Sequence, residues 1–142
     1  MYILKTEHSF DAAHFLAGYN GKCANIHGHH WRVEAEIKSD RLCEQGQMRG
    51  MIVDFGVFKS DLRGEADALD HALLIEEGSL KEKTLDALNE EGFKIISLPF
   101  RPTAENFAKY FHDRLTFLGY DVLRTTVYET PVNCASYCAP ER

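Results

Sequence analysis

The sequence lacks a long apolar run, an excess of basic residues and a linker or repeat that would separate two domains. No stretch of the 142 residues is long and apolar enough to cross a bilayer, and the N-terminus has neither the basic flank nor the apolar run of a secretory signal. The net charge of −6 argues against a nucleic-acid surface, which needs a basic face to neutralise phosphates. We therefore expect a cytoplasmic protein with no membrane or nucleic-acid partner, although one local positive site could still hold an anionic small molecule.

Cysteine is also scarce, with four residues in the chain. In the cytoplasm these thiols are expected to be reduced rather than paired. Cys134 and Cys138 fall in one predicted strand, where their sulfurs would lie roughly 13 Å apart, too far for one tetrahedral ion. We expect both to be core or interface residues. What the sequence does contain, 44% apolar and 27% charged residues, fits a single globular domain over residues 1–142.

Two segments near the N-terminus alternate between apolar and polar side chains, the pattern of a half-buried strand. In residues 2–13 the even-numbered positions are mainly apolar, and His14 continues their parity. In residues 27–38 the odd-numbered positions are apolar from residue 31 onwards, and His27 and His29 share their parity. The alternation thus predicts two strands and assigns these three histidines to apolar faces.

Two amphipathic helices follow, each with a recognisable N-cap. Asp54 precedes apolar residues at helical spacing over residues 55–69, and Thr103 precedes a similar pattern that ends near residue 118. Glu105 falls in the first turn of the second helix, where the helix dipole favours an acidic side chain, so a role in function is only one of two explanations.

The remaining segments complete an α+β pattern. We expect a short helical piece over residues 80–88, a β-branched strand over residues 122–129 and a short strand over residues 134–138. The expected order is ββααββ, which predicts an antiparallel four-stranded sheet with two main helices on one face. The edge strands of such a sheet need covering, and pairing with another subunit is a common solution.

His14, His27 and His29 form the strongest candidate metal site. Residues two apart on a strand point to the same face, so His27 and His29 can share one ion, whereas His30 lies on the charged parity. Three neutral imidazoles with one open position are the arrangement of a catalytic zinc. The alternative is that these are surface or hydrogen-bonded histidines, as most single histidines are.

Other candidate residues carry less specific signals. Cys23 fits four interpretations: a small buried residue, an oxidation-prone thiol, a fourth zinc ligand or a catalytic thiolate, the last two favoured by a nearby dication and Lys22. Asp70 and His71 can form a proton-transfer pair only if the helix has ended, because neighbours in a helix do not face each other. Glu129 is predicted to point inward on its strand, where a carboxylate needs a ligand with N–H donors or a basic partner.

Six motifs occur in order over nearly the whole chain: Phe10-Asp-Ala-Ala-His14, Cys23-x-x-x-His27-Gly-His29, Val53-Asp-Phe, Asp70-His71, Pro102-Thr-Ala-Glu105 and Tyr128-Glu129-Thr. Together they resemble the 6-pyruvoyl-tetrahydropterin synthase superfamily. The short spacing between the cysteine and His-Gly-His is similar to the bacterial, 6-carboxytetrahydropterin-forming branch of the queuosine pathway.

The resemblance implies the tunnelling fold (T-fold), in which ββααββ subunits join through their sheets and two trimers stack as a homohexamer. It implies one Zn²⁺ per subunit and a lyase that converts 7,8-dihydroneopterin triphosphate to 6-carboxy-5,6,7,8-tetrahydropterin, with release of acetaldehyde and triphosphate. By the same resemblance, His14, His27 and His29 would bind the zinc ion, and Cys23 would act as the general base. Asp70 and His71, from a neighbouring subunit, would form a proton relay. Glu129 would clamp the pterin ring, and Thr103 and Glu105 would line the pterin pocket.

Three alternatives stay open: a pyruvoyl-forming or related pterin enzyme, a non-catalytic pterin-binding module, and a zinc hydrolase. A zinc hydrolase would require a glutamate general base at helical spacing after His-x-His, and the sequence has none there. The chain also departs from the family pattern in two places. Ile75 follows Leu74 where the family often has asparagine, and residues 76–98 are longer than the usual connection.

Overall fold

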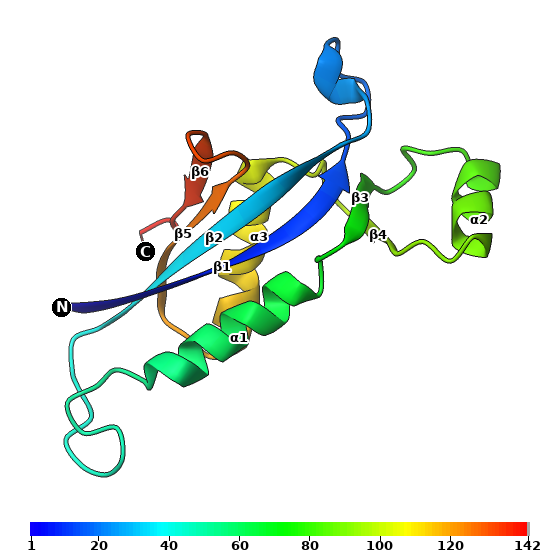
Figure 1. Ribbon diagram of the computed structural model, residues 1–142. Coiled ribbons are helices and arrows are strands. Elements are labelled where there is room, and N and C mark those ends of the chain that lie inside the picture. The colour runs from blue at the N-terminus through cyan, green and yellow to red at the C-terminus, as the bar shows by residue number, and fades with distance from the viewer. Residues whose placement is uncertain (142) are drawn as a thin grey trace.

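The computed structural model describes residues 1–141, which form one curved sheet with helices packed mainly on one face (Figure 1). Within these residues the sheet has six strands in the order β4-β3-β1-β2-β5-β6. The strands are β1 (Tyr2–His14), β2 (His27–Ser39), β3 (Ala72–Glu76), β4 (Ile95–Leu98), β5 (Val122–Tyr128) and β6 (Cys134–Tyr137). The helices are the short 3-10 helix η1 (Lys22–Ala24) and the α-helices α1 (Phe55–Asp67), α2 (Glu82–Glu90) and α3 (Ala104–Phe117).

The long antiparallel pair β1–β2 is the scaffold of the molecule. Its register runs without interruption and places Phe10 opposite Trp31 and His14 opposite His27. Phe10 and Trp31 are buried and their rings stack with centroids 6.0 Å apart. The predicted alternation of both strands is therefore confirmed, and the packed aromatic pair fixes the end of the hairpin at which the histidines lie.

Helices α1 and α3 cover the apolar face of the sheet. The Asp54 carboxylate caps α1 by accepting from Gly56 N at 2.7 Å, and Thr103 Oγ1 caps α3 by accepting from Asn106 N at 3.2 Å, as the sequence predicted. Each helix turns its apolar stripe to the strands. The buried residues are Phe58, Leu62 and Ala66 from α1 and Ala104, Phe107, Ala108, Phe111, His112 and Leu115 from α3.

The α+β class is confirmed, but the prediction of an antiparallel four-stranded sheet was wrong. β3 pairs in parallel with the end of β1, Ala72 opposite Ala12, and β4 pairs in parallel with β3, Leu73 opposite Ile95. Both strands are short, and β3 is a continuous apolar run rather than an alternating one, so neither carries the pattern of a half-buried strand. The short helix predicted at 80–88 is α2, displaced by two residues.

Two smaller predictions also need correction. Cys134 and Cys138 are exposed in this chain, so neither is a core residue. Glu129 lies just beyond β5, which ends at Tyr128. In residues 1–141 no helix is both long and apolar enough to span a bilayer.

Candidate metal centre and active site

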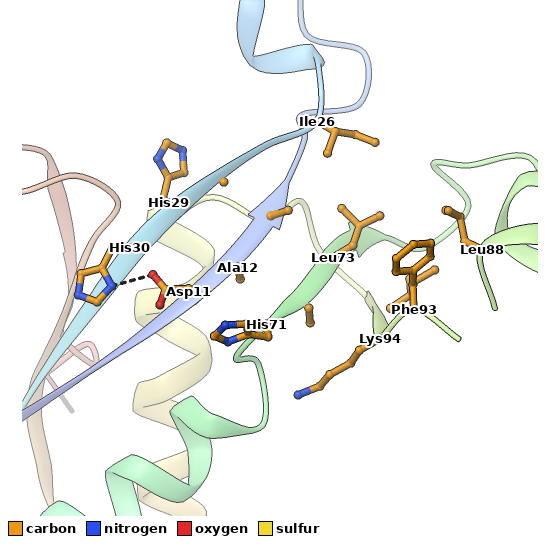
Figure 2. Close-up of a pocket in the computed structure, with 14 residues that line it drawn as sticks. Asp11, Ala12, Ile26, His29, His30, His71, Leu73, Leu88, Phe93 and Lys94 are labelled. Carbon is orange, nitrogen blue, oxygen red and sulfur yellow. Dashed lines mark hydrogen bonds and ion pairs between the residues drawn. The ribbon is translucent and has the colours of Figure 1, made fainter. Parts of the chain in front are cut away.

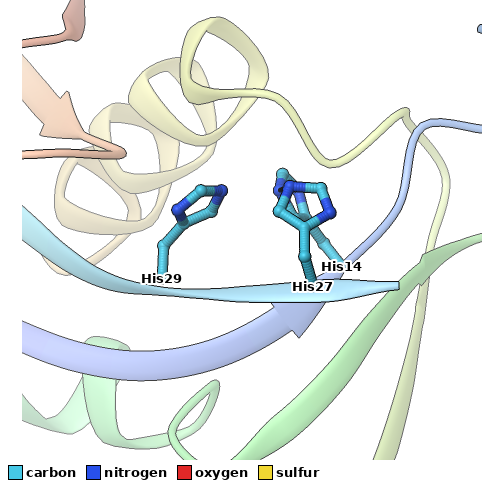
Figure 3. Close-up of side chains that lie close together, drawn as sticks. All are labelled: His14, His27 and His29. Atoms are coloured by element: carbon cyan, nitrogen blue, oxygen red, sulfur yellow. Dashed lines mark hydrogen bonds between the residues drawn. The ribbon is translucent and has the colours of Figure 1, made fainter. Parts of the chain in front are cut away.

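The three histidines selected by strand parity come together at one end of the β1–β2 pair (Figure 3). Each of His14, His27 and His29 offers a ring nitrogen, and these atoms all lie within 4.8 Å of one another. His14 is 1% exposed, and the other two are partly buried. Figure 3 shows the rings on the side of the strands that faces α3. The prediction that these three imidazoles share one face is confirmed.

The Nδ1 atoms of two of the rings are hydrogen-bonded to backbone carbonyls. His14 Nδ1 lies 2.7 Å from the Pro102 oxygen and His27 Nδ1 lies 2.6 Å from the Asn25 oxygen. A carbonyl can only accept, so both Nδ1 atoms must carry the proton, which leaves the Nε2 atom of each neutral ring with a lone pair. The two Nε2 atoms face each other at 3.1 Å.

This geometry fits a metal ion. Two lone pairs that face each other repel unless a proton or a cation lies between them, and two ligands of a tetrahedral zinc lie roughly 3.3 Å apart. Burial is the main cause that lowers the pKa of both His14 and His29, and neighbouring imidazoles lower the pKa of each further. Neutral rings are the form that binds a metal. The donor set is therefore suited to a divalent ion.

Glu129 lies beside this cluster. Its Oε1 atom is 3.4 Å from His29 Nε2, and that nitrogen is buried without a hydrogen-bond partner among the described residues. The side chain of Glu129 is 31% exposed, so its carboxylate stands at the mouth of the cluster rather than inside the core. The expectation of a basic partner for this carboxylate is met in part by the imidazole.

Cys23 lies in η1, on the loop that joins β1 to β2. Its carbonyl accepts from Leu16 N at 2.9 Å, and Arg101 Nη2 donates to the Ala17 carbonyl at 2.9 Å, which ties the base of the loop to the segment before α3. The residue is only partly buried, which argues against the first of the four interpretations, a buried small residue. In the described chain the thiol does not join the group of three histidines, which argues against a fourth protein ligand.

Asp70 and His71 do form a pair, because α1 has ended at Asp67. One carboxylate oxygen of Asp70 accepts from Asp11 N at 2.8 Å, and the other lies 2.8 Å from His71 Nδ1. The Asp11 N–H and then the His71 ring lower the pKa of Asp70, so the carboxylate stays ionised and orients the imidazole. His71 adopts φ +54°, a left-handed conformation that few residues other than glycine favour.

The Asp70–His71 pair does not join the group of three clustered histidines within one chain. His71 lines a cavity of about 650 Å³ whose lining also includes His29, Asp11, His30 and Lys94. Asp11 and His30 have the strand parity opposite to that of the metal histidines, and Figure 2 shows His29 and His71 on opposite sides of the strands. Within one chain the His71 ring is therefore not directed at the group of three histidines.

The two remaining predicted residues lie at the start of α3. Thr103 caps the helix and is partly buried, next to the Pro102 carbonyl that holds His14, while Glu105 is exposed in the first turn. The orienting carbonyls of Asn25 and Pro102 were not predicted from the sequence. A backbone carbonyl carries no signal in the sequence, so only the fold reveals it.

Comparison with known proteins agrees with this geometry. The sequence model of the family described as 6-pyruvoyl tetrahydropterin synthase matches residues 3–140. A 6-carboxy-5,6,7,8-tetrahydropterin synthase of Haemophilus influenzae is 34% identical over 142 residues, covering 96% of this chain and 99% of the relative. The synthase of the same name from Synechocystis sp. is 36% identical over 126 residues, covering 82% of this chain and 98% of the relative.

Solved structures support the same fold. The structure of 6-pyruvoyl tetrahydropterin synthase from Caenorhabditis elegans superposes with a TM-score of 0.66 at 24% identity, covering 99% of this chain and 98% of that one. At that identity the likeness concerns the fold alone. Since the family model spans nearly the whole chain and relatives above 30% identity are matched almost end to end, the chain belongs to the 6-pyruvoyl tetrahydropterin synthase family.

Proposed function

We propose that this protein is a zinc-dependent carbon–oxygen lyase that converts 7,8-dihydroneopterin triphosphate to 6-carboxy-5,6,7,8-tetrahydropterin, releasing acetaldehyde and triphosphate, in queuosine biosynthesis. The observation that carries the proposal is the cluster of three imidazoles within 4.8 Å in a chain that aligns over almost its full length with 6-carboxytetrahydropterin synthases. Location in the cytoplasm stays a prediction from the sequence.

His14, His27 and His29 would hold the zinc ion. When bound, zinc polarises the hydroxyl oxygens of the substrate side chain and makes the protons on the adjoining carbons easier to remove. The Pro102 and Asn25 carbonyls keep two of the rings in the tautomer that presents Nε2. Glu129, beside His29, would accept two parallel hydrogen bonds from the amino group and ring N–H of the pterin.

In the proposed reaction, Cys23 and His71 transfer the protons. Cys23 acts as the general base, and His71, with Nδ1 held by Asp70, presents Nε2 as the second proton carrier. Thr103 and Glu105, at the start of α3, would line the pterin pocket. These roles follow the family resemblance, and the oriented Asp70–His71 pair supports its part in them.

The site is proposed to form between subunits of a homohexamer built from two trimers. The position of His71 on the opposite side of the strands from the His29 ring supports a site shared between copies. The outer edge of β1 also supports assembly. Within the described chain β3 pairs only with Ala12–His14 of β1, so most of that edge lies open to another strand.

The decisive experiment measures metal content and products on one purified sample. The protein incubated with 7,8-dihydroneopterin triphosphate should release acetaldehyde and should contain about one zinc per subunit, as three histidine ligands imply. Removal of the zinc should abolish turnover and its return should restore it. Undiminished turnover after complete removal of the metal would refute the proposal.

A pyruvoyl-forming reaction is the second candidate, because the matched family and the C. elegans enzyme carry that name. Its product keeps the side-chain carbons that the carboxy-forming reaction releases as acetaldehyde. Triphosphate release without acetaldehyde would therefore favour the second candidate.

The Cys23→Ala variant separates an enzyme from a non-catalytic pterin-binding module. An enzyme that uses Cys23 as its base should lose turnover in this variant and keep its zinc, since the thiol is not among the clustered ligands. A binding module would show no turnover in either form.

A further inference from the structure

The peptide bond between Asp70 and His71 is held at both of its polar ends. Its N–H belongs to His71 and donates to the Asp11 carbonyl at 2.6 Å. Its C=O belongs to Asp70 and accepts from Lys94 Nζ at 3.0 Å. We propose that Lys94 is a positioning residue for the Asp70–His71 pair. The inference rests on the proposed function, in which this pair transfers protons.

The pair needs support because its backbone is not in a relaxed conformation. His71 occupies the left-handed region, at φ +54°, which an L-residue with a side chain disfavours. Asp70 follows the end of α1 closely, where carbonyls lack a partner within the helix, and a lysine side chain can satisfy such a group. Rotation of the peptide between Asp70 and His71 is the motion that would carry the imidazole away from the carboxylate. Lys94 opposes that rotation from the side opposite Asp11.

The charge of Lys94 acts in the same direction as its hydrogen bond. The ammonium contributes to the lowered pKa of Asp70, after the larger effects of the Asp11 N–H and His71. An ionised Asp70 is the form that accepts from His71 Nδ1 and leaves Nε2 available to a substrate. Lys94 therefore supports both the geometry and the ionisation of the pair, and it does so without occupying His71 Nε2.

The segment over residues 76–98 brings Lys94 to this position. Lys94 directly precedes β4, and its own carbonyl accepts from Leu73 N at 3.0 Å, so the residue is fixed through its backbone as well as its side chain. β4 then pairs with β3, with Ile95 opposite Leu73. Figure 2 shows Lys94 and His71 at the same cavity. This connection thus returns a cation to the Asp70–His71 turn.

Steady-state kinetics on 7,8-dihydroneopterin triphosphate tests the inference with Lys94→Met and Lys94→Arg. The loss of the ammonium should lower kcat by roughly tenfold to hundredfold, as small misplacements of a reacting group do, and leave KM unchanged. Arginine should restore most of the rate because it can still donate to the Asp70 carbonyl. Lys83→Met is the matched control, since it removes an exposed cation from α2 in the same segment and should leave kcat unchanged.

A second measurement does not depend on turnover. Nitrogen chemical shifts of the His71 ring should report a proton fixed on Nδ1 in the parent protein and a mixture of tautomers in Lys94→Met. Unchanged shifts and kcat in Lys94→Met would overturn the inference, as would a raised KM with unchanged kcat, which indicates contact with substrate. Asp70→Asn separates the two proposals: if it too keeps full activity, the proton relay itself is wrong, whereas if it is inactive, only the role of Lys94 fails.

Discussion

At the scale of single residues, the chemistry of this protein depends on how each imidazole is oriented. His14 and His27 each give their Nδ1 proton to a backbone carbonyl, so both Nε2 atoms point to one place. His71 gives its Nδ1 proton to a carboxylate instead. In the proposed function the first arrangement prepares two metal ligands and the second prepares a proton carrier, although the side chains are chemically identical.

Removal of one clustered imidazole should remove the metal. We expect His27→Ala to lower the zinc content to a small fraction of the parent value, because a catalytic site of this kind has only three protein ligands. His30→Ala is the matched control. Its ring is directed to Asp11, 2.8 Å away, and it should retain zinc. Metal analysis after dialysis measures both, and equal zinc in the two variants would contradict the assignment of the ligands.

At the scale of elements, the start of α3 connects stability to the site. Arg101, Pro102 and Thr103 are consecutive: the first donates to the loop that carries Cys23, the carbonyl of the second holds His14, and the third caps the helix. A change in how α3 begins therefore shifts groups on two other elements. The same helix supplies Phe107, which packs against the buried Trp31 ring at a centroid distance of 5.3 Å.

Loss of the α3 cap should be measurable as a loss of stability. Thr103→Ala removes the acceptor for Asn106 N and should reduce the free energy of unfolding by about 1 kcal/mol. Thr103→Ser keeps the hydroxyl and should stay within a few tenths of a kcal/mol of the parent protein. Urea unfolding of the two variants provides the comparison, and an equal loss in both would show that the hydroxyl does not act as a cap.

The packing of α3 against β6 should make stability sensitive to acid. His112 is buried on α3, with its ring 4.9 Å from that of Tyr137, and burial lowers its pKa. Protonation is easier in the unfolded chain, so this side chain reduces stability as the pH falls below the ordinary histidine value of 6.5. His112→Leu should flatten that part of the stability curve. Parallel curves for the two proteins, measured by urea unfolding across this pH range, would rule the effect out.

At the scale of the whole molecule, two features of the sheet favour assembly. The face opposite the helices carries ion pairs between neighbouring strands, including Lys5 with Glu34 at 2.8 Å and Arg124 with Glu36 at 2.6 Å. Within residues 1–141 the outer edge of β1 has no partner strand over most of its length, because β3 reaches only the end of the strand. A strand edge that is largely without a partner strand is a template for pairing with another subunit.

The parity of β1 identifies how to test assembly through this edge. The N–H of Asp11 donates to Asp70 and its C=O accepts from His71, so the backbone groups of Asp11 face away from β2. Backbone groups two residues apart on a strand face the same way, so the N–H of Ser9 also faces away from β2. Ser9→Pro should therefore remove an outward donor, spare the β2 ladder and shift the protein to smaller species in analytical ultracentrifugation. Ser9→Ala should assemble normally. An unchanged mass for Ser9→Pro would argue against pairing through β1 at this position.

The sequence alone determined the local patterns and the set of metal-binding candidates. Alternation is a property of neighbouring residues, so it defined β1 and β2 and assigned His14, His27 and His29 to one side independently of any contact between distant segments. Capping residues likewise marked the starts of α1 and α3.

Tertiary structure decided what depends on contacts between distant segments. β3 and β4 are short apolar segments that form strands by pairing in parallel with distant parts of the chain. The local sequence pattern does not predict this pairing. The carbonyls that orient His14 and His27, the left-handed His71 and the contact of Lys94 with Asp70 are set by the path of the backbone, which carries no side-chain signal. Residue types thus specified which groups could react, and the fold specified which of them meet.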